Sequence, residues 1–240
     1  MTEVTNLESF RITALPESIY YIPKFLTVSE HSKLLSDLAA VPLPKWTQLS
    51  HRRLIASPSP LTGVNKDTLL RQDLPNWLTT PVLPKFEKLG LFADSPHKKP
   101  NHCLINEYKP GQGIMPHEDG PGYYPCVATV SLGGYSVLEI YEKGQLDRGK
   151  YKWRIVQEPG SLLVTVGGMY KDYLHGIQEV EEDEGLLEEM VCNWNALSDE
   201  WRTRVVESGG KAKRETRTSL TFRDVPKVRD LPFKLPFLRK

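Results

Sequence analysis

Short apolar runs separated by glycine and proline dominate the second half of the chain. Seven of these runs have the length of strands, and they cover residues 103–108, 127–132, 136–141, 153–156, 161–166, 173–177 and 216–222. Turn-forming pairs such as Pro110-Gly111 and Gly133-Gly134 lie between them. Short strands at near-regular spacing predict an antiparallel sandwich or barrel rather than a βαβ fold.

The first hundred residues show a mixed pattern. Residues 19–22 form an apolar run that predicts a short strand. Residues 27–40 carry leucines at helical spacing behind a capping signal, and they predict an amphipathic helix. Residues 81–92 predict a second helix, whereas residues 41–81 are punctuated by proline and are expected to form a long irregular segment.

The composition is that of an ordinary globular protein. The 240 residues include 31 Lys and Arg against 30 Asp and Glu, which gives a net charge of +1, and 39% are hydrophobic. These values argue against a disordered or fibrous chain. No apolar run reaches the length of a membrane span, and residues 1–9 lack the apolar run of a secretory signal, so we expect no membrane contact.

The three cysteines are far apart and form no C-x-x-C pair. This spacing suggests neither a disulfide framework nor a thiolate zinc site, and it predicts reduced thiols. We expect an intracellular protein of the cytoplasm and nucleus, and a monomer.

Charges are unevenly distributed along the chain. Residues 178–200 hold nine acidic residues and no lysine or arginine, and they are expected to be a solvated insert before the last strand. Residues 201–240 reverse the balance, with 12 basic residues against four acidic ones. Because local positive potential can hold phosphate even when the net charge is small, candidate phosphate contacts are Lys211, Lys213, Arg214, Lys227 and Arg229.

A metal site is indicated by His117 and Asp119, which stand two positions apart and therefore share one face of an extended segment. His175 lies in a predicted strand and completes a set of two histidines and one carboxylate. Such a set leaves coordination positions open for substrate and O₂, as in non-haem Fe(II) oxygenases. The alternatives are a chance pair at 117 and 119 and a hydrogen-bonded core histidine at 175.

The last predicted strand carries two arginines. Arg217 and Arg223 are an even number of positions apart, so both face the same side of the strand. Buried guanidinium groups need anions, and a small dicarboxylate held through bidentate contacts fits this requirement. Asn106 and Tyr108 alternate in the same way on an earlier strand and can donate hydrogen bonds to that anion. The alternative is an edge strand whose arginines face solvent.

Four short motifs occur in the order Asn106-Glu107-Tyr108, His117-Glu118-Asp119, His175-Gly176-Ile177 and residues 217–223. Together they resemble the AlkB family of Fe(II)/2-oxoglutarate dioxygenases. The resemblance to one branch of that family is closer at residues 44–50 and 113–121 and at Tyr123-Tyr124-Pro125.

The resemblance implies a mainly β (α+β) protein: a double-stranded β-helix, or jelly roll, with N-terminal helices and an irregular substrate lid. It implies a single domain over residues 1–240, divided into a helical extension and lid at 1–100, a jelly-roll core at 101–224 with the acidic insert 178–200, and a basic tail at 225–240. Iron is then expected on His117, Asp119 and His175.

The same resemblance assigns the cosubstrate contacts. Arg217 and Tyr108 are expected to hold the distal carboxylate of 2-oxoglutarate, and Asn106 and Arg223 to lie near its metal-bound end. The full expected set is Asn106, Tyr108, Arg217, Ser219, Thr221 and Arg223.

The activity implied by the resemblance is oxidative demethylation of N-methylated nucleic acid, either RNA or single-stranded DNA, with Fe(II), 2-oxoglutarate and O₂. Hydroxylation of the methyl group gives an unstable hemiaminal that releases formaldehyde. Two alternatives remain open: a protein demethylase or hydroxylase, and a nucleic-acid binding module with a slow iron site.

Substrate contacts are expected in residues 45–53, where Trp46 stands among basic residues that include Arg52 and Arg53. Single-stranded nucleic acid is bound by aromatic stacking together with phosphate contacts, and this segment offers both. Tyr123 and Tyr124 follow the metal motif. They are expected either to line the pocket or to pack as ordinary loop residues.

Overall fold

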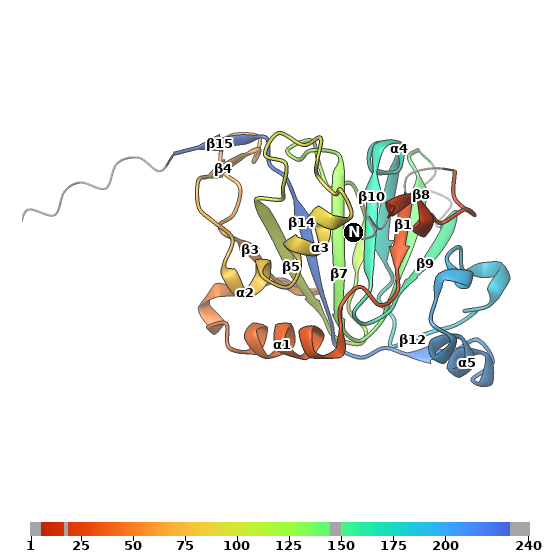
Figure 1. Ribbon diagram of the computed structural model, residues 1–240. Coiled ribbons are helices and arrows are strands. Elements are labelled where there is room, and N and C mark those ends of the chain that lie inside the picture. Colours follow the sequence, from red (N-terminus) through yellow and green to blue (C-terminus); the bar gives the residue numbers. More distant parts are fainter. Residues whose placement is uncertain (1–5, 17–18, 145–149, 231–240) are drawn as a thin grey trace, which may run out of the picture.

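Two antiparallel sheets form the centre of the molecule (Figure 1). The computed structural model describes residues 6–16, 19–144 and 150–230. The larger sheet has the strand order β1 (Ile19–Ile22), β10 (Leu162–Val166), β7 (Cys126–Gly133), β14 (Arg217–Arg223), β5 (His102–Tyr108), β3 (Arg53–Ser57) and β2 (Thr47–Gln48). The smaller sheet has the order β6 (Ile114–His117), β11 (Tyr173–Ile177), β8 (Ser136–Glu142) and β9 (Trp153–Gln157).

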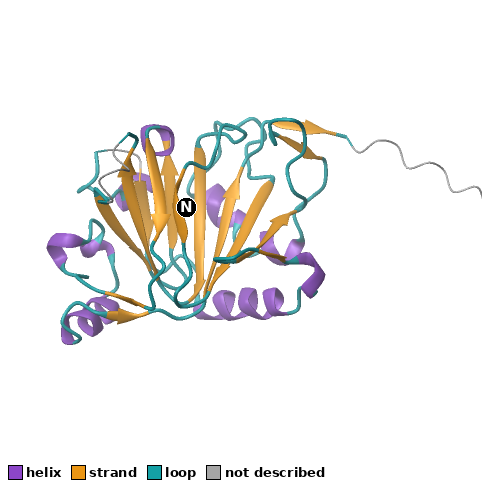
Figure 2. Ribbon diagram, turned by 180° about the vertical axis from the view of Figure 1, so that it is seen from behind, coloured by secondary structure: helices purple, strands orange, loops and turns teal. Residues whose placement is uncertain are grey.

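The predicted jelly roll is confirmed. Each of the seven apolar runs of the second half forms a strand, and Figure 2 shows these strands from behind, with most helices at the margins. β14 lies between β5 and β7, with Arg217 opposite Tyr108 and Arg223 opposite His102. This register places the side chains that alternate on β14 and β5 on a common face.

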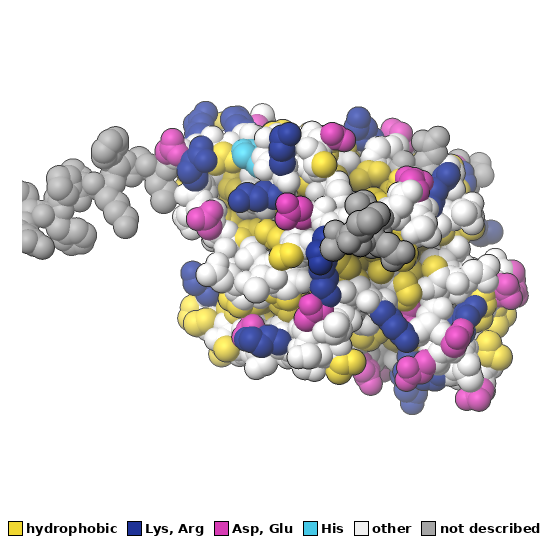
Figure 3. Space-filling view, viewed as in Figure 1, with side chains coloured by type: hydrophobic (Ala, Val, Ile, Leu, Met, Phe, Trp, Pro, Cys, Tyr) yellow, Lys and Arg dark blue, Asp and Glu magenta, His cyan; other side chains and the backbone are white. Residues whose placement is uncertain are grey.

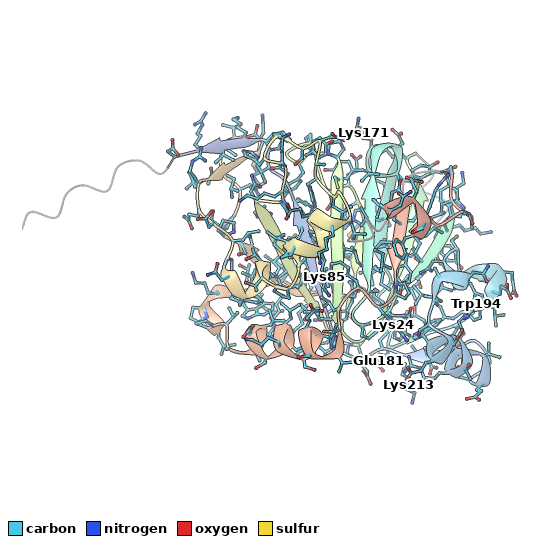
Figure 4. The ribbon with its side chains drawn as sticks, in the orientation of Figure 1. Lys24, Lys85, Lys171, Glu181, Trp194 and Lys213 are labelled. Carbon is cyan, nitrogen blue, oxygen red and sulfur yellow. The ribbon has the colours of Figure 1, made fainter. Side chains whose placement is uncertain are left out.

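Three helices cover the outer face of the larger sheet: α1 (Val28–Ala39), α2 (Asn76–Thr79) and α3 (Leu83–Lys88). Phe86 of α3 meets Phe222 of β14 edge to face, with 5.3 Å between the ring centroids. Lys85 of α3 (Figure 4) donates to Glu30 Oε2 of α1 at 2.5 Å. Both predicted helices are confirmed, and α3 ends early because the chain turns at Gly90, whose φ is +69°.

The segment 41–81 is more regular than expected. β3 pairs with β5 along its whole length, from Arg53 opposite Glu107 to Ser57 opposite Cys103, and β2 pairs with β3. The expectation of an irregular segment was wrong here because the prolines flank residues 47–57 and leave them able to hydrogen-bond as a hairpin. We call residues 47–57 the lid hairpin. α2 and β4 (Thr68–Leu70) follow it.

The acidic insert, residues 178–200, is packed against the protein. Its β12 (Glu182–Asp183) pairs with β13 (Ala212–Lys213). Asp183 is 2% exposed and accepts two hydrogen bonds of 2.7 Å from Arg214 and one of 2.9 Å from the Tyr135 hydroxyl. Its apolar residues are buried beside α5 (Asp199–Glu207), and they are Leu186, Val191, Trp194 (Figure 4) and Leu197.

The expectation of a solvated insert was therefore wrong for this buried half, because a count of charges ignores the apolar positions between them. The exposed acids of the insert fit the expectation, and they are Glu179, Glu181, Glu184, Glu188, Glu189, Asp199 and Glu200.

The basic segment after the insert contains both buried and exposed cations. Arg214 is buried against Asp183, so its predicted role as a phosphate contact was wrong. β15 (Lys227–Arg229) pairs in parallel with β4 and carries exposed cations. Residues 231–240 of the predicted tail lie outside the described residues.

The remaining short elements are α4 (Gly167–Lys171) and 3-10 turns at Leu7–Phe10, Leu43–Lys45, Glu188–Met190 and Trp194–Ala196. Within the described ranges, no helix combines the length and the apolar character needed to cross a membrane.

Candidate active site

A cavity of about 250 Å³ opens between the two sheets. Its wall is formed by β5, β6, β11 and β14, with contributions from the loop after β6 and from the lid hairpin. The predicted residues that line it are Arg52, Asn106, Tyr108, His117, Asp119, Tyr123, His175, Arg217, Ser219, Thr221 and Arg223.

The candidate metal ligands meet because β6 lies close against β11. A Cβ atom at Gly113 would collide with the carbonyl oxygen of Ile177, so glycine is required for this approach. His117 is then opposite His175 in register. Ligand atoms of these two histidines and of Asp119 all lie within 4.8 Å of one another.

The tautomer of His117 suits a metal ligand. Its Nδ1 lies 2.8 Å from the backbone oxygen of Met115, so the Nδ1–H donates there and the Nε2 lone pair is left for a cation. A histidine that binds a metal through one ring nitrogen typically donates a hydrogen bond from the other, as His117 does here. Two imidazoles and one carboxylate are the ligand set of non-haem Fe(II) oxygenases, so the residues present fit Fe(II).

Protonation states in the cluster also suit metal binding. Burial lowers the pKa of His175 to about 4, so its ring is neutral at pH 7. Burial alone would raise the pKa of Asp119, but the guanidinium of Arg223 and the two imidazoles lower it below its ordinary value. A neutral imidazole and an ionised carboxylate are the forms that coordinate metals.

Arg217 is a buried cation without an anionic partner among the described residues. It is 3% exposed, and its Nη2 donates to the Ser131 hydroxyl at 2.9 Å and to Gln157 Oε1 at 3.1 Å, while its Nε has no partner. Burial lowers its pKa to about 10. An uncompensated buried charge is costly, and a carboxylate of 2-oxoglutarate in the cavity would compensate it.

Arg223 lies at the other end of β14. Its anionic partner is a residue of the protein itself, since its Nη2 donates to Asp119 Oδ1. The ring of Tyr123 covers this guanidinium, with 4.7 Å from Cζ to the ring centroid. Arg223 therefore orients a candidate metal ligand, and the Tyr123 ring holds the guanidinium in place through a cation–π contact.

Two cavity tyrosines escaped the sequence analysis. The hydroxyl of Tyr170, in α4, donates to the Gly120 oxygen at 2.7 Å. Tyr173 of β11 packs against Trp153 at a tilt of 56°, with 5.3 Å between the ring centroids. Tyr173 was within reach of sequence reasoning, because it stands two positions before His175 on the same predicted strand. Tyr170 lies in a short helix that no sequence pattern indicated.

The lid hairpin sends one of its predicted side chains into the cavity. Arg52 lines the cavity, and its Nε donates to Asn106 Oδ1 at 3.2 Å. Arg53 instead donates to both carboxylate oxygens of Glu107, at 2.7 and 2.6 Å, and lies 4.1 Å from the centroid of Trp46. Trp46 and Arg53 are therefore absent from the cavity lining.

Tyr123 and Tyr124, which follow the metal motif, lie in different surroundings. Tyr123 lines the cavity, whereas Tyr124 packs against the core on the outer face of the larger sheet, where its backbone N–H donates to the Asp224 oxygen at 2.8 Å.

Known proteins with similar sequences and folds fit this geometry. Residues 18–223 match the model of the 2OG-Fe(II) oxygenase superfamily. The chain is 39% identical over 234 residues to the probable RNA/DNA demethylase ALKBH6 of Danio rerio, covering 94% of this chain and 93% of that protein. It is 34% identical over 97 residues to the alpha-ketoglutarate-dependent dioxygenase AlkB of Escherichia coli (strain K12), covering 40% and 43%. Among solved structures, OsALKBH1 has a similar fold, with a TM-score of 0.56, 15% identity and coverage of 88% and 98%.

Proposed function

Because this chain belongs to the AlkB family of 2OG-Fe(II) oxygenases, oxidoreductases that use Fe(II), 2-oxoglutarate and O₂, we propose that it removes methyl groups from nitrogen atoms of nucleic-acid bases. The observation that carries the proposal is a single cavity lined both by the His117–Asp119–His175 cluster and by Arg217, whose buried charge has no anionic partner within the described ranges. The name of the Danio rerio relative supports the choice of nucleic acid.

In this proposal His117, Asp119 and His175 hold Fe(II). Bound Fe(II) supplies, with 2-oxoglutarate and O₂, the oxidising power that converts a C–H bond to C–OH, with succinate and CO₂ as the other products. When that C–H belongs to an N-methyl group, the hydroxymethyl product loses formaldehyde and leaves N–H.

The chain orients the cosubstrate through β14 and β5. The guanidinium of Arg217 and the hydroxyl of Tyr108 bind the distal carboxylate, since the two residues are opposite each other in register. Asn106 and Arg223 lie toward the metal cluster and bind near the other end. Ser219 and Thr221 form the floor between the two arginines.

The substrate end of the cavity is aromatic. Tyr123, Tyr170 and Tyr173 line it, and aromatic rings are the surfaces on which a flat base stacks. A base can reach the metal cluster in a cavity of about 250 Å³ only after it leaves a helical stack. We therefore propose a single-stranded substrate, RNA or DNA.

Formaldehyde release tests this proposal directly. The purified protein with Fe(II), 2-oxoglutarate and O₂ is assayed on N-methylated RNA, single-stranded DNA, duplex DNA and methylated peptides, with the His117→Ala variant as the control. We expect formaldehyde and succinate in equal amounts from single-stranded nucleic acid and neither product from the variant.

Other outcomes would favour the alternatives. Formaldehyde from peptides alone would make the protein a protein demethylase. Tight oligonucleotide binding with no formaldehyde from any substrate would make it a binding module with a slow iron site.

A further inference from the structure

A small parallel ribbon extends the molecule beyond the end of β14. β4 and β15 pair from Thr68–Lys227 to Leu70–Arg229, although about 160 residues separate them in sequence. The loop 95–101 is fastened beside this ribbon, because His97 N–H donates to Asp224 Oδ2 at 2.9 Å and the Asn101 side chain bonds both backbone groups of Val225. Three separate segments thus meet at one corner.

This corner is rich in exposed cations. Lys and Arg side chains gather at the upper left of the molecule, over β4 and β15 (Figure 3). The residues are Lys66, Arg71, Lys98, Lys99, Lys227 and Arg229, all exposed, and we call them the β4–β15 face. Two of them have acidic partners, Lys227 with Asp67 at 3.1 Å and Arg71 with Asp230 at 2.6 Å.

Lys66, Lys98, Lys99 and Arg229 have no ion-pair partner in the part of the chain that the structure describes. The six cations outnumber the acids of the same segments, which are the half-buried Asp67 and the exposed Asp94 and Asp230. Exposed cations without partners repel one another, and a polyanion relieves that repulsion.

The β4–β15 face is built onto the loop that leads into the cavity. A Cβ atom at Gly122 would lie 3.3 Å from Asp67 Cα and 3.4 Å from the Lys66 oxygen, so the two backbones are in direct contact. The next residue, Tyr123, lines the cavity. A chain bound on this face would therefore pass beside the mouth of the cavity.

The opposite rim carries negative charge. Glu179 lies 3.0 Å from His51 at the tip of the lid hairpin. The N–H of Gly111, shortly before β6, donates to the oxygen of Val180 at 3.1 Å, which brings the neighbouring Glu181 close to this rim. Arg53 of the lid hairpin is already paired with Glu107. The acids beside the lid hairpin repel phosphates, and Arg53, already paired, has no free charge to offer them.

We propose that the β4–β15 face binds the phosphate backbone of a single-stranded nucleic acid on one side of the base that enters the cavity. This inference rests on the proposed function, since it concerns the substrate of the same site. It keeps Lys227 and Arg229, which the sequence suggested, adds cations that the fold gathers from two other segments, and takes the place of the suggested lid residues.

The test uses two full-length variants with the same change in charge. The first replaces Lys66, Lys98, Lys99 and Arg229 by Gln. The matched control replaces four exposed cations that also lack ion-pair partners in the described chain, namely Lys24, Lys88, Lys150 and Arg204. Figure 4 shows Lys24 at the lower right, away from the β4–β15 face.

Binding of a labelled oligo(dT) 15-mer is measured over a range of salt concentrations. Loss of four phosphate contacts should reduce the slope of log K against log salt by up to about 2.8, at about 0.7 for each contact. The control variant should keep the wild-type slope. Equal slopes for the two variants, or a wild-type slope in the first variant, would overturn the proposal.

Formaldehyde release separates this inference from the proposed function. With a methylated 15-mer, the first variant should show a raised KM, whereas with a methylated nucleoside, which has no phosphate, it should match wild type. If wild-type protein demethylates the nucleoside but the two variants have equal salt slopes, phosphate binding at the β4–β15 face is overturned and the proposed function stands. Wild-type protein that releases no formaldehyde from any nucleic acid would overturn the function itself.

Discussion

Arg217 of the cavity wall and Arg53 of the lid hairpin are held in opposite ways. On the wall, Arg217 is buried and its hydrogen-bond acceptors are neutral. On the lid hairpin, Arg53 is held by both oxygens of Glu107 and covers Trp46. The first arrangement needs a ligand, whereas the second is complete without one. An arginine near a cavity therefore indicates a ligand when its charge is buried and uncompensated, and the number of arginines alone does not.

The largest effect should come from the wall. Replacing His117 by Ala removes one of the three proposed ligands of Fe(II), so turnover of 2-oxoglutarate should fall by about 100-fold or more. Succinate formation without substrate measures this, and a thermal melt checks that the variant is folded.

His51→Ala provides the comparison on the lid hairpin, because that imidazole is exposed and contacts Glu179 rather than the cluster. It should retain wild-type turnover without substrate. Wild-type turnover in His117→Ala would show that the metal lies elsewhere.

The next effect concerns the cosubstrate. Arg217→Lys keeps the charge but loses the planar fork that binds a carboxylate through two bonds. The KM for 2-oxoglutarate should rise more than about tenfold, which corresponds to about 1.4 kcal/mol. Arg204→Lys, on the exposed side of α5, is the matched control and should leave that KM unchanged. A KM that stays at the wild-type value in Arg217→Lys would remove Arg217 from the carboxylate site.

The wall was accessible to sequence reasoning because strand alternation decides which residues share a face. The spacing of Arg217 and Arg223 was enough to place both on the cavity side once β14 was recognised. The spacing of His117 and Asp119 also placed both there, although β6 ends at His117 and Asp119 lies in the loop that follows. His175 needed in addition the pairing of β11 with β6, which two separate runs of sequence do not reveal by themselves.

The lid hairpin and the acidic insert were less accessible because their partners are distant in sequence. Arg53 is paired with a residue 54 positions away, and Asp183 with one 31 positions away. A local run of charge contains no information about such partners. It therefore suggested phosphate contacts at Arg53 and Arg214 and a solvated segment around Asp183, where the fold makes ion pairs.

A smaller effect should separate the neighbours Arg52 and Arg53. Arg52→Ala removes a guanidinium that reaches Asn106 in the cavity, so the KM for 2-oxoglutarate or for substrate should rise about three- to tenfold. Arg53→Ala should leave turnover without substrate within about twofold of wild type and lower the free energy of unfolding by about 1 to 2 kcal/mol, because the largely buried Glu107 loses both its bonds.

Steady-state kinetics and urea unfolding of the two variants measure this difference. If Arg53→Ala raised either KM as much as Arg52→Ala, the lid hairpin would contribute to the site through both arginines, and the contrast with the wall would be lost.

The smallest effect is expected at Trp46, where the sequence suggested stacking on a base. One face of its indole is covered by Arg53, and the ring packs against the core of the larger sheet. Because the indole is engaged within the protein, Trp46→Ala should change oligonucleotide affinity less than about twofold at every salt concentration. A base stacked on Trp46 would instead make Trp46→Ala cost about 1 to 3 kcal/mol of binding free energy, independently of salt. Fluorescence anisotropy at low and high salt distinguishes the two results. The effect of a lost phosphate contact on affinity becomes smaller as salt rises, whereas the effect of lost stacking does not.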